Sequence, residues 1–166
     1  MRTRSHRPAA LFAILAAAAA LGVALGSEYW GGLVPCALCL LERWPYRVVI
    51  ALGVLALVLP WRPGRAVLIL TVAVFLAGAV LAGVHVGVEW GLWPSPLPEC
   101  AAPHFVAGTI AQRLAAMPAL PSKPCDAPTY LLPWLPMSMA TMNLLYALAA
   151  AAILTISIPD GTRRRR

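Results

Sequence analysis

Four uncharged apolar stretches constrain what this chain can fold into more than any other feature. Three of them, residues 8–27, 66–88 and 137–158, each run for 20 or more residues without a formal charge. A helix rises about 1.5 Å per residue, so each stretch is long enough to cross a hydrocarbon core of about 30 Å. Only 11% of the 166 residues are charged and 61% are hydrophobic, which is too apolar for a soluble domain. We therefore predict an integral membrane protein.

The remaining apolar stretch, residues 48–61, has only 14 residues and is short for a span. To cross the membrane, its helix must extend backwards through Arg47 and Arg43 towards Cys39. Arg47 can reach the headgroups with its long side chain, and Arg43 is expected near the interface. We place this second span at residues 40–60.

Two prolines bear on the geometry of the second span. Pro45 has no N–H to donate, so we expect the helix to kink or change geometry there. Pro35 suits a helix start just before Cys36. The sequence thus predicts that the pair Cys36 and Cys39 lies at the start of a helix, close to the bilayer surface.

The positions of lysine and arginine predict the orientation. Residues 1–7 contain three arginines, residues 61–65 contain two and residues 159–166 contain four, whereas the long segment 89–136 has only two basic residues. Positive residues collect on the cytoplasmic side, so both termini are expected inside. The long segment is then outside, which in a bacterial inner membrane is the oxidising periplasm. Basic clusters that flank apolar spans are topology signals, and they argue against a nucleic-acid site.

These observations predict an all-α membrane protein, a four-transmembrane-helix bundle forming a single domain. The expected segments are a cytoplasmic tail (1–7), the first span (8–27), a periplasmic loop with the first cysteines (28–39), the second span (40–60), a cytoplasmic turn (61–65), the third span (66–88), a long periplasmic loop (89–136), the fourth span (137–158) and a cytoplasmic tail (159–166).

The first span has a competing interpretation as a cleavable signal peptide. It follows a basic start, has an Ala-rich core and ends in the small residues 24–27. Its apolar run is longer than the core of a usual signal peptide, which favours a retained helix. The intact mass of the purified protein distinguishes the two.

The long loop holds ten of the sixteen prolines, so we expect it to be mostly irregular and mobile. Apolar residues recur at helical spacing only in its middle, at Phe105, Val106, Ile110, Leu114 and Met117. This pattern favours a short amphipathic helix on the membrane surface. A helix packed only on its own loop is the alternative.

Cys36 and Cys39 form a Cys-x-x-Cys pair at the predicted helix start. Helix N-terminal amides and a nearby guanidinium stabilise a thiolate, the form that attacks disulfides and donates electrons. The same spacing also occurs in metal sites.

Arg43 lies one turn after Cys39 on the same helix face, where it can stabilise a thiolate or a reduced acceptor. An interfacial anchor paired with Glu42 explains its position equally well.

Cys100 and Cys125 bracket the long loop, 25 residues apart. A purely structural disulfide fits this spacing. A zinc site that uses all four thiolates fits it poorly, because such sites favour two close cysteine pairs or added histidines. His104 is a candidate ligand, although a solvated loop histidine is the simpler interpretation.

Several segments together resemble the DsbB family, the disulfide bond formation protein B, and the resemblance covers nearly the whole chain. The matching segments are residues 35–43 (PCALCLLER), residues 85–94 (HVGVEWGLWP) before Cys100, and Cys125-Asp126 followed by residues 135–140 (LPMSMA) and Asn143.

The resemblance implies a role for each cysteine. Cys100 would exchange with a DsbA-like periplasmic thiol oxidase of thioredoxin fold, and Cys125 would be its partner in the loop. Cys36 would be the exposed member of the helix pair and would exchange with Cys125. Cys39 would face a membrane quinone and donate electrons to it, with Arg43 bonded to a quinone oxygen.

The resemblance also implies a quinone cofactor, ubiquinone or alternatively menaquinone, and no metal. His85 is expected as a second quinone contact, with a packed helix histidine as the alternative, and Glu89 or Trp90 equally as a border of the ring. The expected function is quinone-dependent oxidation of the DsbA-like partner at the bacterial inner membrane. The rival is a non-enzymatic membrane protein whose cysteines are structural or bind metal.

Overall fold

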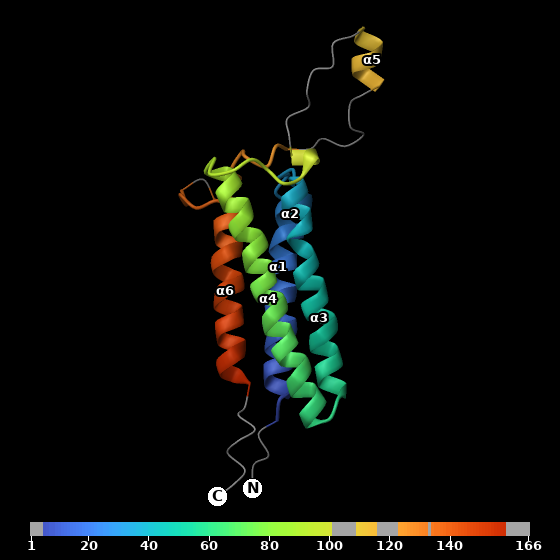
Figure 1. The fold of residues 1–166 in the computed structure, drawn as a ribbon, viewed down its shortest axis with the longest axis vertical. Coiled ribbons are helices and arrows are strands. Elements are labelled where there is room, and N and C mark those ends of the chain that lie inside the picture. Colours follow the sequence, from blue (N-terminus) through green and yellow to red (C-terminus); the bar gives the residue numbers. More distant parts are fainter. Residues whose placement is uncertain (1–4, 101–108, 116–122, 133, 159–166) are drawn as a thin grey trace, which may run out of the picture.

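The computed structural model describes residues 5–100, 109–115, 123–132 and 134–158, and the statements below concern these residues. All of its regular structure is helical (Figure 1). The elements in chain order are α1 (Arg7–Tyr29), α2 (Ala37–Leu41), α3 (Arg43–Val58), α4 (Trp61–Glu89), the 3-10 helix η1 (Pro98–Cys100), α5 (Ile110–Ala115) and α6 (Met139–Ser157).

Among the described residues, three helices are long and apolar enough to cross a membrane: α1, α4 and α6. The second predicted span is made instead of α2 and the 16-residue α3, which follow one another with Glu42 between them. Helical structure therefore extends backwards through Arg47 and Arg43 to Ala37, and the crossing of the membrane by this segment stays a prediction. The break falls one turn before Pro45, because a proline lacks the N–H for the carbonyl four residues earlier and its ring collides with that carbonyl.

The helices differ from the predicted spans mainly at one end of the bundle. Residues 61–65, predicted as a turn, form the first turn of α4, and only Leu59 and Pro60 link α3 to α4. Pro60 caps α4 in an extended conformation, and a proline within a first helical turn removes no needed hydrogen bond. At the other end, Ser138 caps α6 and its hydroxyl accepts the Thr141 N–H at 3.2 Å.

The helices α1, α3, α4 and α6 lie side by side as a four-helix bundle (Figure 1), as predicted. Helix α4 packs against both α3 and α6, and α1 packs against α3. Small residues make the close approach of α1 and α3 possible. Ala10 and Ala13 are completely buried, and a Cβ atom added to Gly53 would lie 2.6 Å from the Ile14 Cγ1 atom. Close backbone packing of this kind stabilises helix pairs in membranes.

Helix α2 and η1 lie together at one end of the bundle, and α1 begins and α6 ends at the opposite end (Figure 1). The basic tails that predict the orientation lie largely outside the described residues, so the orientation stays a prediction. The predicted loop helix is seen as α5, whose Ile110 is 79% exposed. Phe105, Val106 and Met117 lie outside the described residues, and the binding of α5 to a membrane surface also stays a prediction.

Candidate functional site

The four cysteines form two disulfides, Cys36–Cys39 and Cys100–Cys125, with Cα–Cα distances of 5.0 and 4.9 Å. Both pairs contribute to one buried apolar cluster, which also contains Leu38 of α2. Residues separated by up to 89 positions in the sequence are thus brought to one end of the bundle. Thiol–disulfide exchange requires direct contact between sulfurs, so this clustering makes exchange between the two pairs possible.

Cys36 starts α2 as its N-cap residue. Its backbone is extended, and its Sγ atom accepts the Cys39 N–H at 3.1 Å. The loop segment that contains Cys125 lies directly over it, because Cys36 and Lys123 form a parallel β-bridge and the Cys125 N–H donates to the Cys100 carbonyl at 3.4 Å. The loop disulfide therefore covers the helix disulfide.

The prediction that Cys36 is the exposed member of its pair is wrong for this conformation. Cys36 is 3% exposed, because the loop disulfide and His85 cover it, and Cys39 is half-buried. The two sulfurs of one disulfide thus face different surroundings: Cys36 faces the loop pair, and Cys39 lines a cavity between the helices.

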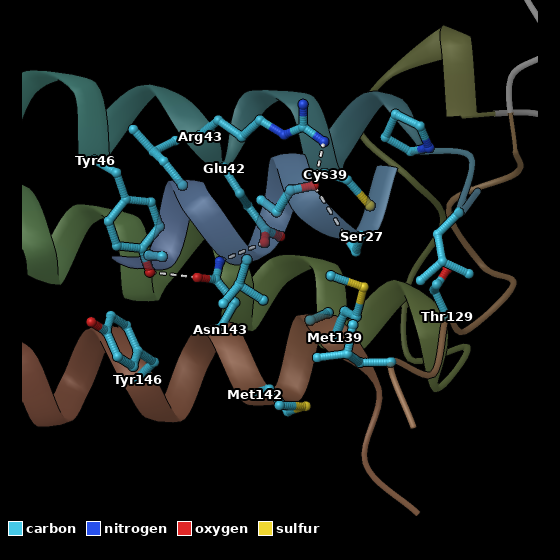
Figure 2. Close-up of a pocket in the computed structure, with 18 of the residues that line it drawn as sticks. Ser27, Cys39, Glu42, Arg43, Tyr46, Thr129, Met139, Met142, Asn143 and Tyr146 are labelled. Carbon is cyan, nitrogen blue, oxygen red and sulfur yellow. Dashed lines mark hydrogen bonds between the residues drawn. The ribbon is translucent and has the colours of Figure 1, made fainter. Parts of the chain in front are cut away.

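This cavity has a volume of about 250 Å³ and lies among α1, α3 and α6, with Cys39 in its wall (Figure 2). Its wall is mostly apolar, with alanines, Leu21 and Val23 from α1 and two methionines from α6. The polar residues that line it include Cys39, Glu42, Arg43, Tyr46, His85 and Asn143. An apolar space with a few convergent polar groups suits a flat hydrophobic ring that carries hydrogen-bond acceptors.

Arg43 lines the cavity and is buried. Its Nη1 atom forms an ion pair with the Glu28 Oε2 atom at 2.6 Å, and its Nη2 atom donates to the Ala24 carbonyl at 3.5 Å. Both partners belong to α1. The alternative that paired Arg43 with Glu42 is therefore wrong, because the guanidinium reaches across to the neighbouring helix instead of to its own neighbour in sequence.

Glu42 occupies the break between α2 and α3 and bonds to two other helices. Its Oε1 atom lies 2.7 Å from the Nδ1 atom of His85, and its Oε2 atom accepts the Asn143 amide at 2.6 Å. The Asn143 Oδ1 atom in turn accepts the Tyr46 hydroxyl (Figure 2). Sequence reasoning did not anticipate this role, since the partners of Glu42 are 43 and 101 positions away.

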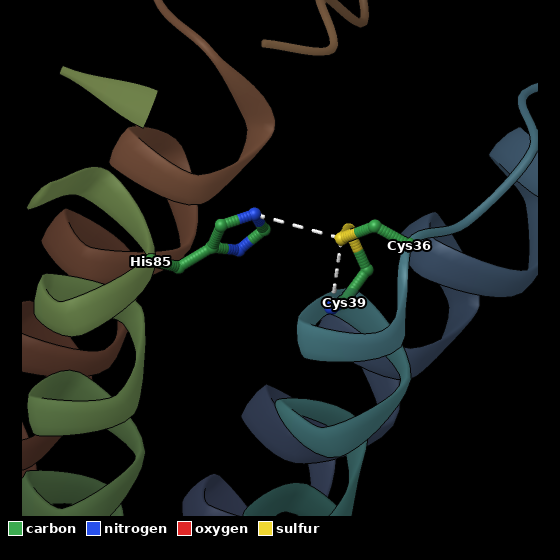
Figure 3. Close-up of side chains that lie close together, drawn as sticks. All are labelled: Cys36, Cys39 and His85. Carbon is green, nitrogen blue, oxygen red and sulfur yellow. Dashed lines mark hydrogen bonds between the residues drawn. A yellow bond between two sulfur atoms is a disulfide. The ribbon is translucent and has the colours of Figure 1, made fainter. Parts of the chain in front are cut away.

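His85 lies between the helix disulfide and Glu42. Its Nε2 atom is 3.5 Å from the Cys36 Sγ atom, and the side chain is buried (Figure 3). His85 also lines the cavity. The role of His85 as a quinone contact stays a prediction, and its contact with Cys36 was not foreseen.

Glu89 and Trp90 lie at the end of α4 and are not among the residues that line the cavity. The Glu89 carboxylate accepts the hydroxyl of Ser138, which caps α6. Trp90 is 69% exposed. Glu89 thus joins α4 to the start of α6, and we do not include either residue among the proposed cavity contacts.

Cys36, Cys39 and His85 also have the composition of a metal site, with ligand atoms within 4.8 Å of one another (Figure 3). Zinc binds thiolates, whereas both sulfurs here are joined in a disulfide. His104, the other candidate ligand, lies outside the described residues. The described arrangement is that of a redox pair beside a histidine.

The comparison with protein families supports this interpretation. The model of the disulfide bond formation protein DsbB matches residues 6–157, which include all four cysteines, Arg43 and His85. The comparison with curated proteins and the comparison with solved structures each found no match. The family match extends over nearly the whole chain, and the helix bundle and both cysteine pairs agree with it. The chain therefore belongs to the DsbB family, a family of multi-pass membrane thiol–disulfide oxidoreductases that form disulfide bonds.

Proposed function

We propose that this protein reoxidises a DsbA-like periplasmic thiol oxidase and passes the electrons to membrane quinone, which sustains disulfide formation in other proteins. One observation carries the proposal: the two sulfurs of the helix disulfide face opposite ways. Cys36 packs with the loop pair, whereas Cys39 lines the cavity beside Arg43. A disulfide so placed connects an exchange partner on one side with an electron acceptor on the other.

The proposed route consists of two exchange steps. A thiolate of the partner attacks Cys100, forms a mixed disulfide and releases Cys125 as a thiolate. The second partner thiol then attacks the mixed disulfide, so the partner leaves oxidised and the loop pair is left reduced. Cys125 next attacks Cys36, which releases Cys39 as a thiolate in the cavity, and Cys100 completes the transfer by attacking Cys125.

The cavity is the proposed quinone site. A bound quinone supplies a two-electron acceptor, which also takes up two protons. Arg43 would hydrogen-bond a quinone oxygen and stabilise both the Cys39 thiolate and the charge on the reduced acceptor, because a guanidinium in an apolar site interacts strongly with nearby anions. Ubiquinone and menaquinone both fit this chemistry.

The proposed location is the bacterial inner membrane, with both termini in the cytoplasm and the cysteines facing the periplasm. Four basic residues in residues 159–166 and three in residues 1–7 support this orientation. The oxidising periplasm is also the compartment in which structural and catalytic disulfides persist.

The test is partner-dependent quinone reduction in detergent. Reduced DsbA-type oxidase is mixed with this protein and a soluble ubiquinone or menaquinone analogue, and the quinone absorbance is followed. We expect the absorbance to fall only when all three components are present. No quinone reduction with either analogue would refute the proposal and favour structural cysteines. The Cys125→Ser variant gives an independent check, because it should accumulate a mixed disulfide between Cys100 and the partner.

A further inference from the structure

Five side chains form a continuous series of contacts from the helix disulfide into the bundle. From the cysteine inward, it runs through Cys36, His85, Glu42, Asn143 and Tyr46. We call these residues the Glu42 network. They come from the start of α2, from α3, α4 and α6, and from the break between α2 and α3. Glu42 is the central member, because both of its carboxylate oxygens are bonded within the network.

The hydrogen-bond directions in this network can be followed from the tyrosine. The Tyr46 hydroxyl donates to the Asn143 Oδ1 atom, which leaves the Asn143 amide N–H to donate to Glu42. An ionised carboxylate accepts on both oxygens, so the His85 Nδ1–H donates to the other one. The neutral imidazole then has its lone pair on Nε2, the atom that faces the Cys36 Sγ atom at 3.5 Å.

We propose that Glu42 is a positioning residue that holds His85 as the proton acceptor for Cys36 when the helix disulfide re-forms. This inference rests on the proposed function and assigns the proton path of its last step. Cys36, His85 and Glu42 then have the relation of a thiol, its base and the carboxylate that orients the base.

The reduced helix pair holds Cys39 as a thiolate and Cys36 as a thiol, so formation of the Cys36–Cys39 bond releases two electrons and one proton. Both electrons and the Cys36 proton go to the quinone, which becomes a quinol when it takes a second proton from water. The Cys36 proton passes first to the His85 Nε2 atom. Because His85 also lines the cavity, it can return this proton on the side where the acceptor is reduced.

The burial of Glu42 supports a fixed role. Glu42 is 7% exposed and His85 is 3% exposed. A buried carboxylate is stable only when its hydrogen bonds are satisfied, and here a donor from α4 and a donor from α6 satisfy both oxygens. The imidazole is therefore held through its Nδ1 atom, and its Nε2 atom lies 3.5 Å from the Cys36 Sγ atom (Figure 3).

The experiment isolates the last step in the full-length chain. The parent is the Cys100→Ser/Cys125→Ser variant, which keeps only the helix pair and is reduced beforehand with a small dithiol. Rapid mixing with a soluble quinone analogue gives a maximal rate and a half-saturating quinone concentration. Glu42→Gln preserves the shape of the side chain and should lower the maximal rate about 10- to 100-fold. The half-saturating concentration should change by less than about 2-fold, because both oxygens of Glu42, although it lines the cavity, are bonded to His85 and Asn143.

Two further variants keep the test decisive. His85→Ala should lower the maximal rate by at least about 100-fold, and added imidazole should restore part of it, as expected for a missing base. Glu99→Gln removes an equivalent charge from an exposed side chain near the loop disulfide and should leave both parameters unchanged. Partial rescue by imidazole would also show that the His85→Ala variant is folded.

The outcomes distinguish failure of the proposed function from failure of the role proposed for Glu42. If the parent variant does not reduce quinone, the proposed function itself fails. If the parent is active but Glu42→Gln keeps its maximal rate, or changes only the half-saturating concentration, Glu42 is not the positioning residue. Absence of imidazole rescue in His85→Ala would exclude His85 as the proton acceptor.

Discussion

The two disulfides lie in one cluster but are built in different ways. Cys36–Cys39 joins positions three residues apart at a helix start, where a backbone N–H and His85 contact the Cys36 sulfur. Cys100–Cys125 joins positions 25 residues apart, at the end of a three-residue 3-10 helix and in a turn. The first pair lies at the start of the five-residue α2, which leads directly into α3 of the bundle, whereas a 3-10 helix and a turn hold the second.

This difference suggests that the two disulfides have different roles in the reaction. Transfer of electrons to a bound acceptor requires a fixed geometry, which rigid helices provide better than loops. Exchange with a separate protein and then with a second internal cysteine requires a disulfide that can approach two partners in turn. We infer that the helix pair serves the acceptor and that the loop pair serves the partner protein. Replacements of residues on each side of the relay test this inference.

The largest effect is expected from single cysteine replacements in the two pairs. Cys39→Ser should reduce quinone only at background rate, whether the electrons come from the partner or from a small dithiol, because the sulfur that lines the cavity is lost. Cys100→Ser should lose only the partner-driven reaction. Quinone absorbance with each electron donor measures both variants. If Cys39→Ser turned over quinone normally, or if Cys100→Ser lost both reactions, the inference would be wrong.

Arg43 should matter for the acceptor and not for the partner. Arg43→Ala removes a buried charged hydrogen-bond donor from the cavity and should raise the half-saturating quinone concentration about 10-fold or more. Arg47→Ala is the matched control, because Arg47 is exposed and stacks on Trp44, and it should have little effect. Trapping of the partner by Cys100 should be normal in both variants. An unchanged quinone affinity in Arg43→Ala would return this residue to the role of an interfacial anchor.

A smaller effect is expected at Lys123, which holds the loop segment over Cys36. Its Nζ atom donates to the Pro128 carbonyl at 3.0 Å and to the Thr129 hydroxyl at 2.7 Å. Lys123→Met should loosen this cover and speed reduction of the Cys36–Cys39 disulfide by a small thiol about 3-fold. Quantitative alkylation of the released thiols measures the rate.

The matched control is Arg62→Met, which removes an exposed charge from the first turn of α4, away from the disulfides. It should leave the rate of reduction unchanged. An equal rate in Lys123→Met and in the native protein would mean that the loop segment does not limit access to Cys36.

The sequence predicted the bundle better than the site. Uncharged stretches of sufficient length located α1, α4 and α6, and Pro45 indicated a break in the second span to within one turn. The helix ends were predicted less accurately. Pro60 can precede a helix as readily as it can follow one, so the start of α4 at Trp61 was not recognised. The hydrogen bonds of Glu42 to His85 and Asn143 could not be predicted from the sequence. They join residues of different helices, and local sequence patterns do not specify how those helices are rotated relative to one another.

For the cysteines too, contacts between distant segments could not be predicted from the sequence. Their types and spacing identified both pairs, and the family resemblance supplied their roles. The burial of Cys36 was not foreseen, because it depends on where residues 123–125 return to the bundle. That position is determined by contacts between segments about 90 residues apart, such as the bridge between Cys36 and Lys123.

The most direct test of the relay is whether the two pairs exchange through the sulfurs that the structure places together. The Cys39→Ser/Cys100→Ser variant leaves only Cys36 and Cys125, and peptide mapping by mass spectrometry identifies any disulfide that forms. The account predicts an intramolecular Cys36–Cys125 disulfide, and little or no Cys39–Cys125 disulfide in the matched Cys36→Ser/Cys100→Ser variant. Two free thiols in the first variant, or equal cross-linking in both, would contradict it.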